Sequence, residues 1–139
     1  MRKNFLLILA LMLVSLIGLA ACGHDEEVYI ITDRFFTRQV TSAQTNPQEY
    51  LGRTVQFNGM FMSEVCDVTN DIFFFVGQQP DDCCGGGFMG PIGFEIYLGN
   101  TDPVEENAWV QVIGVFEHYV IPGFDFPILR VNVRTMVPL

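Results

Sequence analysis

Lysine and other cations are scarce in this sequence. Its 139 residues hold seven lysines and arginines against 16 aspartates and glutamates, so the formal net charge is −9, and no lysine follows Lys3. Because a chain of this sign repels phosphate backbones, nucleic acid is not expected among its partners. The same charge opposes a domain that lies flat on anionic lipid, and it favours solubility and the attraction of cations.

Signatures of several enzyme and cofactor classes are missing as well. No glycine-rich phosphate loop precedes a helix, no cysteine pair has the CxxC spacing of zinc sites, and no group of residues suggests a catalytic triad. His24 lies on a polar tether, which is more simply a solvated linker. His118 lies on the apolar face of a strand, where we expect a hydrogen-bonded histidine near the mouth of a barrel rather than a ligand. We therefore do not expect an enzyme.

The N-terminus has the organisation of a secretory signal. Met1-Arg2-Lys3-Asn4 is a short positive region, and an apolar run from Phe5 to Ala21 follows, near the lower length limit for a spanning helix. The run ends in Leu19-Ala20-Ala21-Cys22, which resembles the lipobox of bacterial lipoprotein precursors. A signal anchor with an incidental cysteine is the alternative, but charge, apolar length, small residues and cysteine coincide here.

The lipobox resemblance implies a lipid anchor. In such precursors the cysteine thiol takes a diacylglycerol and a peptidase cuts before it, so residues 1–21 would be a signal peptide and Cys22 the acylated N-terminus. Two or more acyl chains, palmitate among them, hold a protein stably on a membrane. Gly23 in place of Asp suggests the outer membrane in a two-membrane host, and the cell membrane otherwise. We expect a lipid-anchored, extracytoplasmic protein whose first partner is membrane lipid.

The mature chain is expected to be one domain behind an N-terminal tether. Residues 22–139 number 118, enough for a single core, and carry five arginines against 16 acids, a net charge of −11. Residues 22–45 are interpreted as the lipidated tether and an arm, in which residues 28–31 predict a short strand. Phe35-Phe36 is too apolar to remain in water, so the arm should dock on the domain of residues 46–139.

The rest of the chain predicts a mostly β fold. Asn46 to Gly52 carries the signals of a short helix, with Asn46 as its cap and Gly52 at its end. Strands are predicted over 54–62, 72–76, 94–98, 109–120 and 127–137, with bends at Gly59 and Gly114. This pattern favours a small OB-like five-stranded barrel with one short helix and a docked N-terminal arm; up-and-down barrels and small sandwiches are the alternatives. The predicted core residues are Val55, Phe57, Phe73, Phe75, Phe94, Ile96, Val110, Val112, Leu129, Val131 and Val133.

One loop carries a pattern that suggests chemistry. Asp81-Asp82-Cys83-Cys84 precedes three glycines, in a stretch too polar and glycine-rich for the core. Thiolates bind soft or borderline cations such as zinc or copper(I), and the two aspartates would add carboxylate ligands. The alternatives are a vicinal disulfide that shapes the loop, a disulfide to Cys66, and cysteines buried as small hydrophobes. We expect Cys66 not to pair, because a hairpin turn would lie ~25 Å from the loop, beyond the ~7 Å limit for a disulfide.

The order of several short motifs resembles a known family. The motifs are Tyr50-Leu51-Gly52-Arg53, Cys83-Cys84, Trp109-Val110-Gln111-Val112-Ile113-Gly114 and Pro138. They occur in the order found in the C-terminal domain of YcgQ-like membrane proteins, the partners of YraQ-like permeases. The resemblance covers residues 46–139 and implies an OB-like domain associated with metal-ion homeostasis, zinc especially. This chain departs from the family in Gln78-Gln79 before the cysteines, and it has a lipid anchor where the family has transmembrane helices.

The sequence leaves two functions open. The first is a membrane-anchored accessory module that handles a thiophilic metal ion such as zinc through Cys83, Cys84, Asp81 and Asp82, with a membrane permease or metal transporter as its partner. The second is a structural or partner-binding envelope module whose cysteines only shape a loop. A bound metal needs reduced thiols, whereas the structural function favours an oxidised pair.

Overall fold

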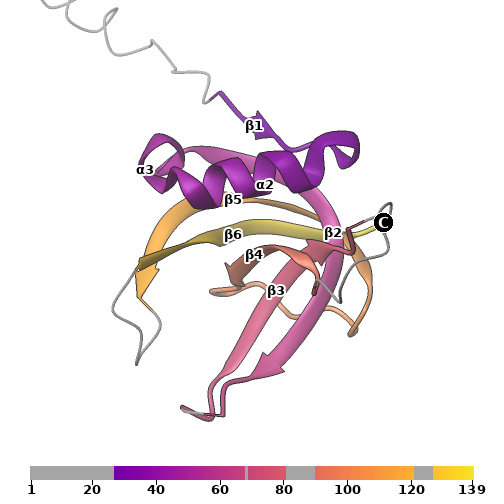
Figure 1. Ribbon diagram of the computed structural model, residues 1–139. Helices are drawn as coiled ribbons and strands as arrows, with labels where there is room; N and C mark the ends of the chain where they lie inside the picture. The colour runs from indigo at the N-terminus through magenta and orange to yellow at the C-terminus, as the bar shows by residue number, and fades with distance from the viewer. Residues whose placement is uncertain (1–26, 68, 81–89, 121–126) are drawn as a thin grey trace, which may run out of the picture.

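The computed structural model describes residues 27–67, 69–80, 90–120 and 127–139 (Figure 1). Strands make up most of this part of the chain, and its helices all precede the second strand. The elements are β1 (Tyr29–Ile30), the 3-10 helix η2 (Asp33–Phe35), α2 (Phe36–Thr45), α3 (Pro47–Tyr50), β2 (Thr54–Val65), β3 (Ile72–Gln78), β4 (Ile92–Tyr97), β5 (Trp109–Val120) and β6 (Pro127–Pro138).

Strands β2 to β6 form a closed barrel. The hydrogen-bonded order of the sheet is β1-β2-β3-β4-β6-β5, and a further pairing of β2 with β5 closes it. Neighbours in the barrel are antiparallel except β4 and β6, which pair in parallel at Ile96↔Val131 and Tyr97↔Asn132. The prediction of a mostly β, OB-like five-stranded barrel is confirmed.

Closure of the barrel requires β2 to pair with two strands, β5 and β3. Its first half pairs with β5 and its second half with β3, and Met60 pairs with both. Gly59 lies beside this change of partner, where a Cβ would be 2.8 Å from Val76 Cγ1 and 2.9 Å from the Gly77 carbonyl oxygen. Glycine is therefore required where the strands come this close. At Gly114, the other predicted bend, the register of β5 against β6 shifts.

The interior of the barrel is apolar and aromatic. The Phe94 ring contacts those of Phe57 and Phe116 edge to face, with centroids 5.5 and 5.0 Å away. Every predicted core residue outside β3 is buried, and these are Val55, Phe57, Phe94, Ile96, Val110, Val112, Leu129, Val131 and Val133. The alternation of apolar and polar residues in these strands therefore predicts their inward faces correctly.

The assignment of Phe73 and Phe75 to the core is wrong. Val76 is fully buried, and Phe74 packs against the core, its ring stacked on that of Phe61 with centroids 5.6 Å apart. Phe73 and Phe75 alternate with these residues and lie on the outer face of β3. Three successive phenylalanines offer no polar side that would reveal the alternation, so the register with β2 decides which ring faces inward.

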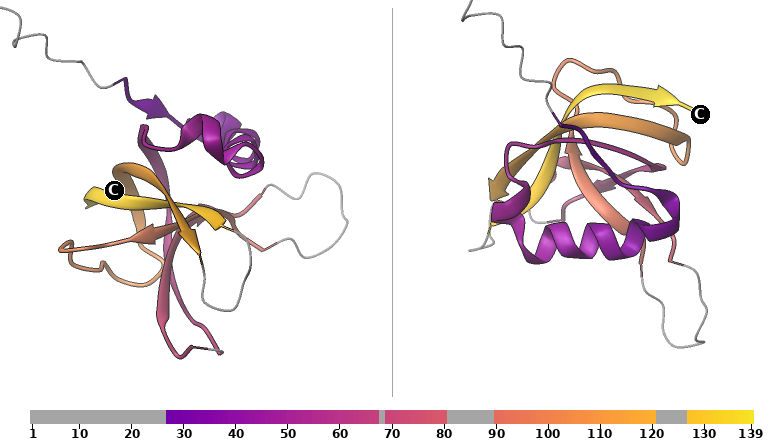
Figure 2. Two further views of the ribbon diagram at one scale, coloured as in Figure 1. Left: turned by 90° about the vertical axis from the view of Figure 1, so that its left-hand side faces the viewer. Right: turned by 90° about the horizontal axis from the view of Figure 1, so that it is seen from above.

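A helical layer covers one end of the barrel (Figure 2). α2 buries Phe36, Val40 and Ala43, whose i, i+4, i+7 spacing places them on one face. Sequence analysis predicted that this arm docks but not that it is helical. Half of its ten residues are Thr, Ser or Val, which are weak helix formers, so burial of one face rather than local propensity stabilises the helix.

α3 is a single turn where sequence analysis predicted a helix from Asn46 to Gly52. The Asn46 side chain makes no capping hydrogen bond, so the predicted cap is wrong. Asn46 also ends α2, because its N–H donates to the Ser42 carbonyl oxygen at 3.0 Å. Gly52 follows the turn at a φ of 79°, which agrees with its predicted role as a stop.

The N-terminal arm docks on the barrel as predicted. β1 pairs in parallel with β2 at Tyr29↔Val55 and Ile30↔Gln56, and Ile31 is buried in the core. Within the described residues, no helix combines the length and apolar character needed to cross a membrane.

Candidate functional site

The residues predicted to hold a metal lie outside the part of the chain that the structure describes. This applies to the whole predicted set and to the predicted acylation site: Asp81, Asp82, Cys83, Cys84 and Cys22. The structure does define where this segment departs and returns. Gln78, the last residue of β3, pairs with Ile92, the first residue of β4. One hairpin of the barrel therefore carries the predicted site.

Two glycines bring the strands of this hairpin close together. Gly77 pairs with Gly93, and a Cβ on Gly93 would overlap the Val76 carbonyl oxygen. A Cβ on Gly77 would lie 2.5 Å from the Ile92 carbonyl oxygen. Such contacts exclude any side chain, so the close approach depends on glycine in both strands. The role of this glycine pair was not predicted from sequence.

Side-chain amides tie the hairpin to the elements around it. The Gln44 Nε2 of α2 donates to the Gly93 carbonyl oxygen at 2.7 Å. The Gln78 Nε2 donates to the Asn58 carbonyl oxygen and to Asp33 Oδ1, both at 3.0 Å. The helical layer and β2 thus hold both ends of the predicted site in place.

His118 presents a buried nitrogen inside the barrel. It lies on β5 opposite Leu129 of β6, and its Nε2 is buried without a hydrogen-bond partner in the described residues. The expectation of a fully hydrogen-bonded histidine is therefore wrong for this atom. A buried polar atom without a partner costs on the order of 1–3 kcal/mol. Such an atom requires a specific explanation, and a ligand is one.

The strand pairing places His118 near the base of the predicted site. Val131 of β6 pairs with Phe116 of β5 on one side and with Ile96 of β4 on the other. His118 on β5 and Phe94 on β4 each lie two residues from this row, in the direction of the hairpin base. His118 is therefore level with Phe94, the neighbour of Gly93. Two strand spacings of ~4.8 Å separate β5 from β4, or ~10 Å across the sheet.

The described residues do not form a metal site by themselves. No three of their His, Cys, Asp and Glu side chains gather closely enough to hold a cation. Cys66 is partly buried in the turn between β2 and β3, where its N–H donates to the Asp71 carbonyl oxygen at 2.9 Å. Its separation from Cys83 and Cys84 involves residues outside the described part of the chain and stays a prediction.

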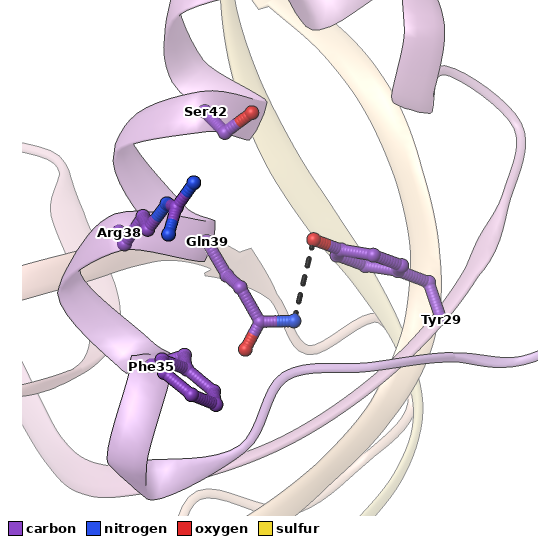
Figure 3. A pocket seen from close by; sticks show the side chains of 5 residues that line it. All are labelled: Tyr29, Phe35, Arg38, Gln39 and Ser42. Carbon is purple, nitrogen blue, oxygen red and sulfur yellow. Dashed lines mark hydrogen bonds between the residues drawn. The ribbon is translucent and has the colours of Figure 1, made fainter.

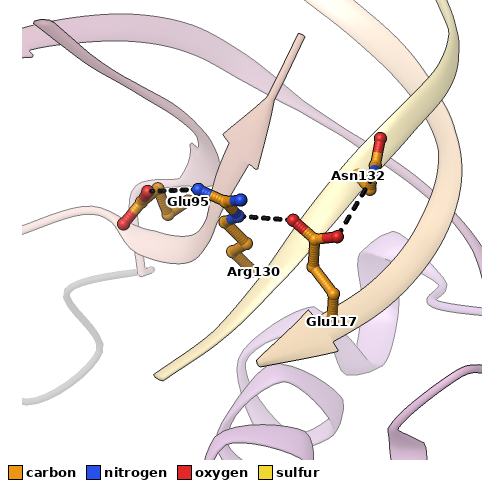
Figure 4. A network of polar contacts seen from close by, with 4 residues as sticks. All are labelled: Glu95, Glu117, Arg130 and Asn132. Carbon is orange, nitrogen blue, oxygen red and sulfur yellow. Dashed lines mark hydrogen bonds and ion pairs between the residues drawn. The ribbon is translucent and has the colours of Figure 1, made fainter. Parts of the chain in front are cut away.

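A second group of polar residues lies on the outer face of the barrel (Figure 4). Arg130 Nε donates to Glu117 Oε1 at 2.6 Å, and Arg130 Nη1 is 3.9 Å from Glu95 Oε1. The guanidinium also lies over the rings of Tyr97 and Tyr119, 4.8 and 4.0 Å from their centroids. These residues come from β4, β5 and β6, so the group spans the parallel seam between β4 and β6.

The cation of this group is already paired within the chain. Burial raises the pKa of the Glu95 carboxyl above its ordinary value, and the nearby Arg130 guanidinium opposes that rise. The second oxygen of Glu117 accepts from Asn132 Nδ2 at 3.1 Å. We therefore interpret the group as a support for the barrel seam. The adjacency of β4 and β6 that assembles the group was not predicted from sequence.

A shallow pocket lies between the N-terminal arm and α2 (Figure 3). Its volume is about 290 Å³, and it is lined by Tyr29, Phe35, Arg38, Gln39 and Ser42. Gln39 fastens the arm to the helix, since its Nε2 donates to the Ile30 carbonyl oxygen at 3.2 Å and to Tyr29 Oη at 3.4 Å. Burial raises the pKa of the Tyr29 phenol above its ordinary value. Sequence analysis did not foresee this pocket, because its helical wall was not predicted.

Comparisons with known proteins identify a family for the domain. No curated protein matches the chain. Among solved structures, a mitochondrial single-stranded DNA-binding protein from S. cerevisiae, Rim1, is similar over 63% of this chain and 95% of its own, with 18% identity and a TM-score of 0.38. The family described as the DUF1980 C-terminal domain matches residues 19–138, which is most of the chain. The chain belongs to the DUF1980 C-terminal domain family.

Proposed function

We propose that this protein is a lipid-anchored, extracytoplasmic accessory module that binds a thiophilic metal ion, with zinc as the first candidate. Cys83 and Cys84 supply the thiolates in this proposal, and Asp81 and Asp82 are the nearest carboxylates. Acylated Cys22 holds the module on the cell membrane or outer membrane. It acts as a binding module and not as an enzyme.

The observation that carries the proposal is the buried, unpartnered Nε2 of His118. A neutral imidazole nitrogen is the commonest protein ligand for transition metals, and zinc accepts mixed thiolate and imidazole ligands. Cys83 follows Gln78 by five residues, and at ~3.3 Å each these span up to about 17 Å. The segment after Gln78 is therefore long enough for the two thiols to reach His118 on β5. His118 is the ligand that sequence analysis set aside.

The relationship to YcgQ-like membrane proteins is also part of this proposal. The motifs shared with YcgQ-like membrane proteins support a partnership with a membrane permease or metal transporter. A lipid anchor would replace the transmembrane helices of those relatives and would keep the module beside such a partner. The net charge of −9 supports attraction of cations to this surface.

Zinc titration of the acylated chain in detergent tests the metal site. We expect one zinc per chain by competition with a chromophoric chelator, with loss of binding in Cys83→Ser/Cys84→Ser. Cys66→Ser is the matched control and should retain full stoichiometry. His118→Gln should weaken binding at least tenfold, since it removes an imidazole ligand while keeping a polar side chain of similar size.

The alternative function is a structural or partner-binding envelope module. Thiol counting separates the two functions. Two results together would reject the metal site. Thiol counting on the unfolded chain would show Cys83 and Cys84 joined as a disulfide, and the folded chain would take up no zinc after reduction.

A further inference from the structure

Charge is unevenly distributed between the two layers of the molecule. Residues 27–53, which form the arm and the helices, carry three arginines and three acids and are neutral. Residues 54–139, which include the barrel strands β2 to β6, carry two arginines and eleven acids, a net charge of −9. The whole-chain charge led to the expectation that the domain avoids anionic lipid. By its charge, the barrel fits this expectation, whereas the neutral helical layer gives no reason for it.

Both ion pairs among the described residues involve Arg130 of the barrel. The arginines of the helical layer therefore have no carboxylate partner in the described part of the chain. Arg34 lies over the Phe35 ring at 5.3 Å, and Arg53 lies over the Tyr29 ring at 5.0 Å. Arg38 lines the pocket between these two rings (Figure 3). We call these five residues, Arg34, Phe35, Arg38, Tyr29 and Arg53, the arginine–aromatic face.

This face is suited to the surface of a bilayer. Guanidinium groups bind phosphate oxygens through paired hydrogen bonds, and aromatic rings favour the boundary between headgroups and acyl chains. The Phe35 side chain is 50% exposed beside its arginine. An anionic headgroup would supply the negatively charged partner that the three guanidinium groups lack among the described residues.

The length of the tether brings the face to the membrane. Cys22 precedes the first described residue, Glu27, by five residues, which span at most about 17 Å when extended. β1 follows directly, and it lies in the helical layer at one end of the molecule (Figure 1). The tip of the β2–β3 hairpin lies at the opposite end. An anchored chain therefore keeps the helical layer within reach of the bilayer.

We propose that the arginine–aromatic face docks on anionic lipid and orients the barrel away from the membrane. This inference rests on the acylation of Cys22 in the proposed function. The −9 charge of the barrel reinforces the orientation, because anionic lipid repels that end and accepts the neutral one. The acids of the tether, Asp25 to Glu27, oppose docking, so the three arginines are essential to it.

Tryptophan reporters in the acylated chain test the docked orientation. Phe35→Trp in a Trp109→Phe background places a single reporter on the face, and Ile72→Trp in the same background is the matched control. Ile72 is 60% exposed at the hairpin tip and so resembles Phe35 in exposure. Vesicles contain brominated phosphatidylcholine with or without phosphatidylglycerol. We expect quenching and a blue shift for the Phe35→Trp reporter in anionic vesicles only, and neither for the Ile72→Trp reporter.

The charge requirement is tested by adding Arg34→Gln/Arg38→Gln to the Phe35→Trp reporter. Loss of two surface arginines should make docking about 30-fold less favourable and abolish most of the quenching. Equal quenching at both reporters, or none at either in an acylated, vesicle-bound chain, would overturn the docking face alone. A chain that lacks acyl groups by mass spectrometry and does not float with vesicles would overturn the proposed anchor and this inference together.

Discussion

At the scale of single residues, glycine decides how closely the strands of this barrel approach. Gly59, Gly77 and Gly93 all lie where a Cβ would meet a neighbouring backbone at 2.9 Å or less. Gly77 and Gly93 pair directly, at the base of the segment that holds Cys83 and Cys84. The hairpin therefore depends on two glycines, which have no side chain that could bind a ligand, and this dependence is testable.

Gly93→Ala should destabilise the protein by about 2–3 kcal/mol, because the new methyl group meets the Val76 carbonyl oxygen and the strands must separate. Gly90→Ala is the matched control, since a Cβ there has nothing within 4 Å. Its change should stay within about 0.5 kcal/mol. Urea unfolding gives both values. Equal stability of the two variants would show that the strands are not in such close contact.

Glu95 should make stability depend on pH. Its folded-state pKa is raised above the ordinary 4.5, chiefly by burial, so the folded chain holds this proton more tightly than the unfolded chain. The resulting stabilisation is present below pH 4.5 and is lost as the pH rises through the folded-state pKa. Urea unfolding of wild type and Glu95→Gln measures it.

The stability advantage of wild type over Glu95→Gln should therefore shrink as the pH rises above 4.5. Glu49→Gln, an exposed carboxylate on α3, controls for general charge effects. An advantage that instead grows with pH would mean that the Arg130 pairing outweighs burial.

At the scale of elements, the limits of sequence analysis have physical causes. Strands with an apolar and a polar side, such as β4 and β6, were assigned the correct faces. β3 was not, because its three phenylalanines look alike from either side and only the pairing with β2 distinguishes them. α2 was missed because half of its residues are weak helix formers and burial of one face stabilises the helix.

Val40 on α2 tests whether burial holds this helix. Val40 is fully buried, so Val40→Ala should cost roughly 2 kcal/mol in unfolding free energy and reduce helical circular dichroism. Thr41→Ala changes the neighbouring exposed position and should be neutral or slightly stabilising, since alanine favours helices. A Val40→Ala protein as stable as Thr41→Ala would indicate that α2 contributes little to the core.

At the scale of the whole molecule, the barrel has two structurally different ends. The helical layer, which begins just after the first described residues, covers one end, and the β2–β3 hairpin projects at the other (Figure 1). The fold class could be predicted because five strands and their turns are visible in sequence. The candidate site could be predicted only as a loop, since its histidine and its glycine base come together through strand pairing.

The position of Cys66 provides a test of this arrangement. Cys66 lies in the β2–β3 turn, where its carbonyl oxygen accepts from the Asn70 N–H at 2.8 Å. From the turn, β3 runs from Ile72 to Gln78, or ~20 Å at ~3.3 Å per residue, before the segment with Cys83 and Cys84 begins. A disulfide requires Cα atoms within ~7 Å, so Cys66 should bridge neither cysteine. Non-reducing peptide mapping of the oxidised chain should find no bridge from Cys66 to Cys83 or Cys84, and reductant should change the melting temperature of Cys66→Ser as much as that of wild type. A Cys66–Cys83 or Cys66–Cys84 peptide would show that the segment folds back along the hairpin, and a structural disulfide would then replace the metal site.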